Sequence, residues 1–310
     1  MTTLDKFRGV FPAFYACYDD EGNISPERIR QLAEHYRDVG VKGLYVGGSS
    51  GECIYQTVEE RKLVLEEVVK AVGDDMTIIA HVAAASTHNS IELAQHAESL
   101  GKVDALAAIP PLYYQLPDHA VENYWMSIIR STELNFIIYN IPSTTGYELS
   151  PAMYDKMLAD PRVIGIKNSS IPVQDIYQFR KIQRHESVIF NGADEQFIAG
   201  RMMGADGGIG GTYGVMPELF MELDKLFKAC KLEEAQALQY DINEIITKIT
   251  SGHGSMYDII KHVIKINDGI ELGSVREPLP RANGDDEERI EEIASLIKKY
   301  EAKYLGKVLA

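Results

Sequence analysis

The chain has 310 residues, of which 45% are hydrophobic and 25% charged, so it can fold as one large α/β barrel or as two ordinary domains. Its formal net charge of −15 argues against nucleic acid or an anionic membrane as a partner, because both bind basic patches. We expect no signal peptide and no span of ~20 apolar residues. Cys17, Cys53 and Cys230 form no CxxC pair, which predicts a cytoplasmic protein with buried thiols and no disulfide or zinc framework.

Short apolar runs alternate with amphipathic segments over the first 225 residues. Several runs are rich in Val, Ile and Tyr and are too short for helices. They therefore predict strands that are buried on both faces. The predicted strands are Phe11–Cys17, Gly43–Gly48, Thr77–Ala83, Ala105–Pro110, Phe136–Pro142, Val163–Lys167, Val188–Gly192 and Gly207–Gly211.

Helix-start and helix-stop signals lie between these strands. Ser25-Pro26 predicts the start of a helix that ends at Gly40, because serine caps free N–H groups and glycine suits the C-terminal position. Thr57 and Glu60 have the spacing of a capping box. Eight strands alternating with helices predict a (β/α)8 TIM barrel, and a doubly wound open sheet is the alternative.

The strand pattern stops after Pro217, and only helical patterns follow. We expect residues 1–225 to form the catalytic barrel. Residues 226–310 are expected to form a C-terminal helical extension that packs on the barrel. The predicted helices here are Leu219–Cys230, Leu232–Thr250, Ser255–Asn267 and Asp285–Tyr304.

Lys167 ends the sixth predicted strand, after Val163–Ile166. The active sites of TIM barrels lie at the C-terminal ends of the strands. A lysine buried there loses hydration, which lowers its pKa toward a neutral amine that can attack a ketone and form an imine. A structural lysine paired with a carboxylate is the alternative interpretation of this residue taken alone.

Tyr139 ends the neighbouring predicted strand after Ile137 and Ile138, so it can face the same pocket as Lys167. A phenol hydroxyl there can move a proton to and from a substrate. The alternative is an ordinary buried tyrosine.

The segment Gly47–Glu52 combines three glycines with two hydroxyls at a predicted strand end. Successive backbone N–H groups of such a turn suit one carboxylate. A purely structural turn is equally compatible with this segment alone. A phosphate loop is disfavoured because no Gly-Lys-Ser/Thr follows.

Asp194 and Glu195 follow the seventh predicted strand. Carboxylates at a barrel mouth can hold sugar hydroxyls or exchange protons, whereas the alternative is a solvated helix start. We expect no metal site, because the histidines lack HxH or HExxH spacing. Gly204–Gly214 offers either a phosphate site or glycine-packed backbone beside a ligand.

Four segments resemble, in order and spacing, the motifs of the dihydrodipicolinate synthase / N-acetylneuraminate lyase family, and the resemblance covers nearly the whole chain. It implies a TIM barrel with a C-terminal helical extension, assembled as a homotetramer (a dimer of dimers). It also implies a lysine Schiff base with pyruvate or a pyruvate-containing sugar acid, and no cofactor. The segments are Gly47-Gly48-Ser49-Ser50-Gly51-Glu52, Tyr139-Asn140-Ile141-Pro142, Gly165-Ile166-Lys167 and Gly192-Ala193-Asp194-Glu195.

Carried over residue by residue, the resemblance implies that Lys167 forms the Schiff base and that Tyr139 moves protons. Ser50 would orient Tyr139, and Tyr113 would reach into the neighbouring subunit to complete that relay. The substrate contacts implied by the resemblance are Ser49, Ser50, Ser169, Gly192, Asp194, Glu195 and Gly211.

The chain is more similar to the lyases of the family than to the synthases. Its Gly-Gly-Ser-Ser-Gly-Glu loop and Asp194 motif resemble those of lyases, and Thr144 replaces the arginine with which synthases grip their aldehyde substrate. We therefore expect reversible cleavage of N-acetylneuraminate to N-acetylmannosamine and pyruvate, ahead of lysine biosynthesis.

Two departures leave the sugar open. Ala193 replaces a common tyrosine, and Gly211 stands where a sugar-binding serine is often found. They motivate an aldolase for another 2-oxo-3-deoxy sugar acid as the alternative. A non-catalytic sugar-acid-binding protein is a third hypothesis, although binding alone needs neither Tyr139 nor Lys167.

Overall fold

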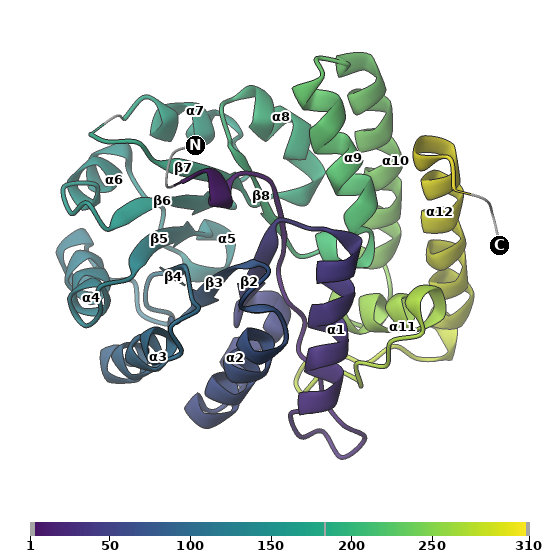
Figure 1. Cartoon of the computed structure of the whole chain (residues 1–310), viewed down its shortest axis with the longest axis horizontal. Helices are drawn as coiled ribbons and strands as arrows, with labels where there is room; N and C mark the ends of the chain where they lie inside the picture. The colour runs from purple at the N-terminus through teal and green to yellow at the C-terminus, as the bar shows by residue number, and fades with distance from the viewer. Residues whose placement is uncertain (1–3, 183, 308–310) are drawn as a thin grey trace.

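A parallel barrel forms the centre of the computed structural model, which describes residues 4–182 and 184–307. Its eight strands follow the order β1-β8-β7-β6-β5-β4-β3-β2, with helices arranged around them (Figure 1). Between β1 and β2, Ala13 bridges Tyr45, and Phe14 N donates to Tyr45 O at 2.9 Å. The predicted TIM barrel is therefore confirmed. The strands are β1 (Val10–Pro12), β2 (Gly43–Val46), β3 (Thr77–His81), β4 (Ala105–Ala108), β5 (Asn135–Asn140), β6 (Val163–Asn168), β7 (Val188–Asn191) and β8 (Gly207–Gly210).

Alternate strand residues fill the barrel interior, as period-two geometry requires. They include aromatic side chains from several strands, so the barrel is a packed core and not a pore. The chemistry is confined to the end of the barrel where the strands have their C-termini, which we call the upper barrel. The residues of this inner cluster on the strands themselves are Phe11, Tyr45, Ile79, Ala105, Ala107, Ile137, Tyr139, Ile164, Val188, Phe190 and Ile209.

The helices begin and end where local chemistry satisfies the backbone. Ser25 accepts from Arg28 N at 3.4 Å, and Gly40 ends the helix with φ +91°, as predicted. Thr57 and Glu60 form the predicted capping box, with hydrogen bonds of 2.8 and 3.1 Å. The barrel helices are α1 (Pro26–Val39), α2 (Val58–Val72), α3 (Thr87–Ser99), α4 (Asp118–Arg130), α5 (Pro142–Thr145), α6 (Pro151–Met157), α7 (Gln174–Arg180) and α8 (Phe197–Met202).

The predicted C-terminal helices gather at one side of the barrel (Figure 1). They are α9 (Pro217–Lys228), α10 (Leu232–Thr250), α11 (Met256–Asp268) and α12 (Glu287–Leu305). Their buried faces join the hydrophobic core that surrounds the strands. Position 225, the predicted boundary between barrel and extension, lies within α9. Short 3-10 helices complete the fold: η1 (Asp5–Phe7), η2 (Ser49–Gly51), η3 (Cys53–Tyr55), η4 (Asp194–Gln196), η5 (Tyr213–Val215) and η6 (Gly284–Asp286).

The first strand is shorter than predicted. The apolar run Phe11–Cys17 is buried throughout, but β1 ends at Pro12. The residues after β1 are buried because they continue between other segments of the barrel. Ala13 N donates to Gly210 O at 3.0 Å, and Ala16 N donates to Ser50 O at 3.4 Å. These contacts bury the segment without adding it to the strand.

Only part of the prediction for the cysteines is confirmed. Cys17 is buried, Cys53 is partly buried and Cys230 is exposed. The buried position predicted for Cys230 is wrong, because this residue lies in the short turn between α9 and α10, where its side chain is exposed.

Between residues 4 and 307, leaving out residue 183, none of the helices combines the length and the apolar character needed to cross a membrane.

Candidate active site

Lys167 lies inside the upper barrel on β6, with only 4% of its surface exposed. Its register partners are Tyr139 on β5 and Phe190 on β7. Its Nζ lies 4.0 Å from the centroid of the Tyr139 ring and 4.6 Å from that of the Tyr45 ring. Burial lowers the pKa of Lys167 to about 7, and the charge of Asp194 acts in the opposite direction. A large share of the amine is therefore neutral near pH 7, which is its nucleophilic form.

Tyr139 is also buried, and burial raises its pKa to about 12. The hydroxyls of Ser169 and Ser49 act in the opposite direction on this phenol. The phenol is thus protonated at neutral pH and available as a proton donor. The Tyr139 ring also makes an edge contact with Tyr45, at 5.9 Å between centroids, and these contacts fix its orientation.

The predicted anion loop follows β2 and contains the helix η2. Gly47 begins it with φ +77°, a left-handed conformation that favours glycine. Ser49 is exposed and Ser50 is 3% exposed. The two predicted binding hydroxyls therefore differ in access: Ser49 lies near Tyr139, whereas the Ser50 hydroxyl faces Tyr257 of α11. The orientation of Tyr139 by Ser50 stays a prediction.

Asp194 is a buried carboxylate at the start of η4. Its Oδ2 accepts hydrogen bonds from the N–H and the hydroxyl of Thr212, both at 2.7 Å. Its Oδ1 is buried and has no hydrogen-bond partner among the described residues. Burial raises the pKa of Asp194 to about 6. One oxygen of this side chain is thus anchored, and the other is available to a ligand hydroxyl.

Two glycines make room for these polar groups. A Cβ added to Gly210 would lie 2.3 Å from Asp194 Oδ1, and a Cβ added to Gly192 would lie 2.0 Å from Ser169 Oγ. Both distances are far shorter than a van der Waals contact, so only glycine fits. The Ser169 hydroxyl is buried and makes no hydrogen bond of ordinary geometry within the described chain. Ser169 and Gly192 therefore lie side by side, as the predicted site requires.

Glu195, Gly211 and Tyr113 complete the predicted set. Glu195 is exposed beside buried Asp194, and Gly211 O accepts from the Tyr15 hydroxyl at 2.6 Å. Tyr113 is 92% exposed and has φ +81°, which is rare for a residue with a side chain. The described residues therefore leave most of Tyr113 exposed, and its ring makes an edge contact with that of Tyr114 at 4.9 Å between centroids.

Several residues of the site were missed from the sequence. Thr212 holds Asp194, Tyr45 contacts Lys167, and Tyr257 reaches the Ser50 hydroxyl from the C-terminal extension. Tyr45 could have been found, because it occupies an inward-facing position on β2. No signal near Tyr257 indicated a role, since α11 is remote from the barrel in sequence.

His81 supports the anion loop from the next strand. Its Nδ1 lies 2.9 Å from Gly47 O, and Ile109 N donates to its Nε2 at 3.4 Å. Burial lowers the pKa of His81 to about 3. The ring is neutral, with Nδ1 as the donor and Nε2 as the acceptor, and it acts as a structural link.

No group of three or more His, Cys, Asp or Glu side chains within residues 4–182 and 184–307 is arranged as a metal site.

Comparisons with known proteins agree with this geometry. The sequence pattern of the Dihydrodipicolinate synthetase family matches residues 6–298. The N-acetylneuraminate lyase of Mediterraneibacter gnavus is 53% identical over 306 residues, which cover 98% of this chain and 97% of that protein. The solved Ruminococcus gnavus sialic acid aldolase is 53% identical, with a TM-score of 0.95, over 97% of this chain and 100% of that one.

A second structure of that aldolase carries a mutated catalytic lysine. It aligns with a TM-score of 0.96 and 53% identity, over 98% of this chain and 100% of that one. The family pattern and this relative each span nearly the whole sequence. The chain therefore belongs to the Dihydrodipicolinate synthetase family.

Proposed function

We propose that the protein is a Schiff-base aldolase that reversibly cleaves N-acetylneuraminate to N-acetylmannosamine and pyruvate. One observation carries the proposal: the buried Lys167 amine, with its pKa lowered to about 7, lies 4.0 Å from the Tyr139 ring. The identity of 53% with a protein named N-acetylneuraminate lyase supports the choice of substrate.

The chemistry follows from the Lys167 amine. Its neutral form attacks the ketone carbon of the substrate, and loss of water gives a protonated imine. The imine nitrogen accepts the electron pair when the bond between the α and β carbons breaks, so an aldehyde leaves and an enamine remains. The Tyr139 phenol, protonated at neutral pH, gives its proton to the hydroxyl that leaves as water when the imine forms. The resulting phenolate takes the β-hydroxyl proton as the aldehyde forms and passes it to the enamine carbon. It regains a proton from the water that hydrolyses the imine. Protonation of the enamine carbon and hydrolysis of the imine release pyruvate and the free lysine.

We expect the carboxylate and the sugar chain of the substrate to contact different residues. The Ser49–Ser50 turn offers hydroxyls and backbone N–H groups to the carboxylate. We expect the sugar chain to contact four residues: Ser169, Gly192, Asp194 and Glu195. The free Oδ1 of Asp194 suits a hydroxyl donor. We expect the reaction to need no metal or organic cofactor, because the imine itself is the electron sink.

An exposed apolar patch supports self-assembly. Ile54, Tyr113 and Tyr114 are 64%, 92% and 70% exposed, and Ile54 and Tyr113 border a largely apolar pocket of about 370 Å³. Such a patch suits a symmetric contact with a second copy. We propose a homotetramer in which Tyr113 reaches the neighbouring site, in the cytoplasm. Analytical ultracentrifugation tests the assembly, and a monomer at micromolar concentration would contradict it.

A second candidate is cleavage of another 2-oxo-3-deoxy sugar acid. Gly211 offers no side chain to the sugar, and Ala193 only a methyl group, so the usual contacts are reduced. The synthase reaction is disfavoured because Thr144, an exposed residue, cannot replace an arginine clamp on a carboxylate.

Turnover measurements distinguish the candidates. The purified protein is assayed for pyruvate release from N-acetylneuraminate and from 2-oxo-3-deoxy hexonates at equal concentrations. We expect N-acetylneuraminate to give the larger kcat/KM. Negligible cleavage of it, with turnover of a hexonate, would favour the second candidate.

A further inference from the structure

Glu52, the last residue of the anion loop, forms a buried ion pair with the C-terminal extension. Its Oε1 accepts from Lys261 Nζ of α11 at 2.9 Å, and the two side chains are 0% and 2% exposed. Its Oε2 accepts from Arg276 N at 2.9 Å and from the Tyr18 hydroxyl at 3.3 Å. Both oxygens therefore bind groups of the C-terminal extension, and Oε2 also binds Tyr18.

The backbone at Glu52 depends on these contacts. Glu52 has φ +53°, a left-handed conformation that a residue with a side chain rarely takes. It follows η2 directly, only two residues after Ser50. Any shift of Glu52 therefore moves the Ser49–Ser50 turn.

The same helix contacts the loop at Ser50. Tyr257 lies four residues before Lys261, so both side chains project from one face of α11. A Cβ added to Gly211 would lie 3.2 Å from Ser50 Oγ and 4.0 Å from Tyr257 Cε1, which places the serine and the tyrosine around the same glycine. The Ser50 hydroxyl also acts on the pKa of Tyr257 through a hydrogen bond.

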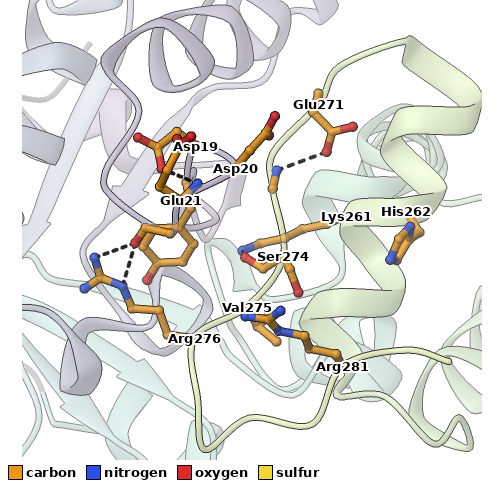
Figure 2. A pocket seen from close by; sticks show the side chains of 13 residues that line it. Asp19, Asp20, Glu21, Lys261, His262, Glu271, Ser274, Val275, Arg276 and Arg281 are labelled. Atoms are coloured by element: carbon orange, nitrogen blue, oxygen red, sulfur yellow. Dashed lines mark hydrogen bonds between the residues drawn. The ribbon is translucent and has the colours of Figure 1, made fainter.

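Lys261 also borders a pocket of about 370 Å³ (Figure 2). Lys261, Ser274 and Arg276 line it, and Lys261 Nζ also donates to Ser274 O at 2.9 Å. The Tyr18 ring lies 4.8 Å from Lys261 Nζ and 4.6 Å from the Arg276 guanidinium carbon. The Lys261 ammonium is thus held by protein groups on several sides, which favours a fixed position.

We propose that Tyr257 and Lys261 of helix α11 position the Ser49–Glu52 loop for the substrate carboxylate, so that the C-terminal extension sets the affinity for pyruvate. This inference rests on the proposed function, in which that loop binds the carboxylate. The two residues act through the loop and touch no reacting atom, so they are positioning residues.

The location of the pair suits this role better than a purely stabilising one. A buried ion pair loses much of its Coulombic gain to desolvation, so it adds little stability relative to an apolar pair, although removal of one partner alone leaves a costly unpaired charge. Hydrogen bonds from the loop to a carboxylate, in contrast, weaken steeply when donors move by a fraction of an ångström. A displaced loop therefore reduces pyruvate affinity while Lys167 and Tyr139 keep their places on β6 and β5.

The test is the pyruvate dependence of borohydride trapping by the purified full-length protein. The variants are Glu52→Gln, the double variant Glu52→Gln with Lys261→Met, and Tyr257→Phe. Lys265→Met is the matched control, because Lys265 lies on the same helix and pairs with Glu271 on the surface, where they are 59% and 40% exposed. Circular dichroism and thermal melting report folding separately.

We expect the half-saturating pyruvate concentration to rise roughly tenfold in Glu52→Gln and in the double variant. This is the effect of losing one charge-assisted hydrogen bond between the loop and the pyruvate carboxylate. Tyr257→Phe removes only a hydroxyl and should raise it about threefold. The limiting trapping rate should stay within about twofold of the native rate in each case, and the control should match the native protein.

Three results would overturn the inference. The half-saturating pyruvate concentration could stay at its native value both in Tyr257→Phe and in the Glu52 variant that folds. The variants could lose thermal stability alone, which is the mark of a structural role. Finally, the native protein could fail to trap pyruvate on Lys167, a result that would overturn the proposed function as well.

Discussion

Tyr139 and Lys167 are register partners on β5 and β6, and the lysine amine lies 4.0 Å from the centre of the phenol ring. The face of the ring favours the ammonium form, whereas burial disfavours it. Burial prevails, so the pKa of Lys167 falls to about 7. Both protonation states are thus populated near neutrality, and the position of this balance governs the predictions below.

The rate of imine formation with pyruvate should rise with pH through about 7 and then level off. The neutral amine is the attacking form, and Lys167 is mostly neutral above its lowered pKa of about 7. Initial rates of borohydride trapping, measured at a series of pH values, give the midpoint, the pH at which the rate of imine formation is half its plateau. A rate that climbs only toward pH 10, where an ordinary lysine loses its proton, would contradict the lowered pKa.

Asp194→Asn should shift that midpoint to lower pH. Asp194 raises the pKa of Lys167 through its charge, and the amide removes the charge while it keeps an acceptor for Thr212. The kcat/KM for the sugar acid should fall roughly 10- to 100-fold, because a charge-assisted hydrogen bond to a hydroxyl is lost. Half-saturation by pyruvate alone should stay unchanged, and a parallel loss for pyruvate would place Asp194 elsewhere in the site.

Tyr139→Phe should separate imine formation from cleavage. The substitution keeps the ring beside Lys167 and removes only the hydroxyl, so the fold and the imine with pyruvate should persist. Cleavage of the sugar acid should fall about 10²- to 10⁴-fold, the usual contribution of a positioned proton donor. Cleavage at the native rate, measured in a coupled pyruvate assay, would show that another group moves the proton.

Lys167→Met should stabilise the folded protein. The pKa of Lys167 is about 7 in the fold, against a normal value of 10.5, so the folded chain binds fewer protons between these values and its stability rises with pH there. Methionine has no such dependence. Its advantage should be about 3–5 kcal/mol near pH 6 and smaller near pH 9. Urea denaturation near pH 6 and near pH 9 measures the free energy of unfolding of both proteins. A stability difference that does not change with pH would contradict a desolvated Lys167.

The barrel was predictable because its signals are local. Eight buried runs, the cap at Ser25 and the capping box at Thr57 and Glu60 depend on a few neighbouring residues, and the structure confirms each of them. The length of β1 was not predictable. The apolar run continues to Cys17 because the residues after β1 pass between other segments of the barrel, and no local pattern encodes contacts such as Ala16 N to Ser50 O.

The centre of the site was predictable for a related reason. Residues at the ends of parallel strands converge at one end of the barrel, so Tyr139 and Lys167 could be paired from their positions alone. Thr212 and Tyr257 could not. The first is identified only by its hydrogen bonds to Asp194. The second comes from a helix that meets the barrel through contacts between residues far apart in sequence, such as Lys261–Glu52.

Covalent trapping tests the central claim most directly. The protein is incubated with pyruvate and borohydride, digested, and examined by mass spectrometry. We predict one reduced pyruvate adduct, located on Lys167, and no adduct in a folded Lys167→Ala variant. An unmodified Lys167, or an adduct on another lysine that persists in Lys167→Ala, would contradict the assignment of Lys167 as the Schiff-base residue.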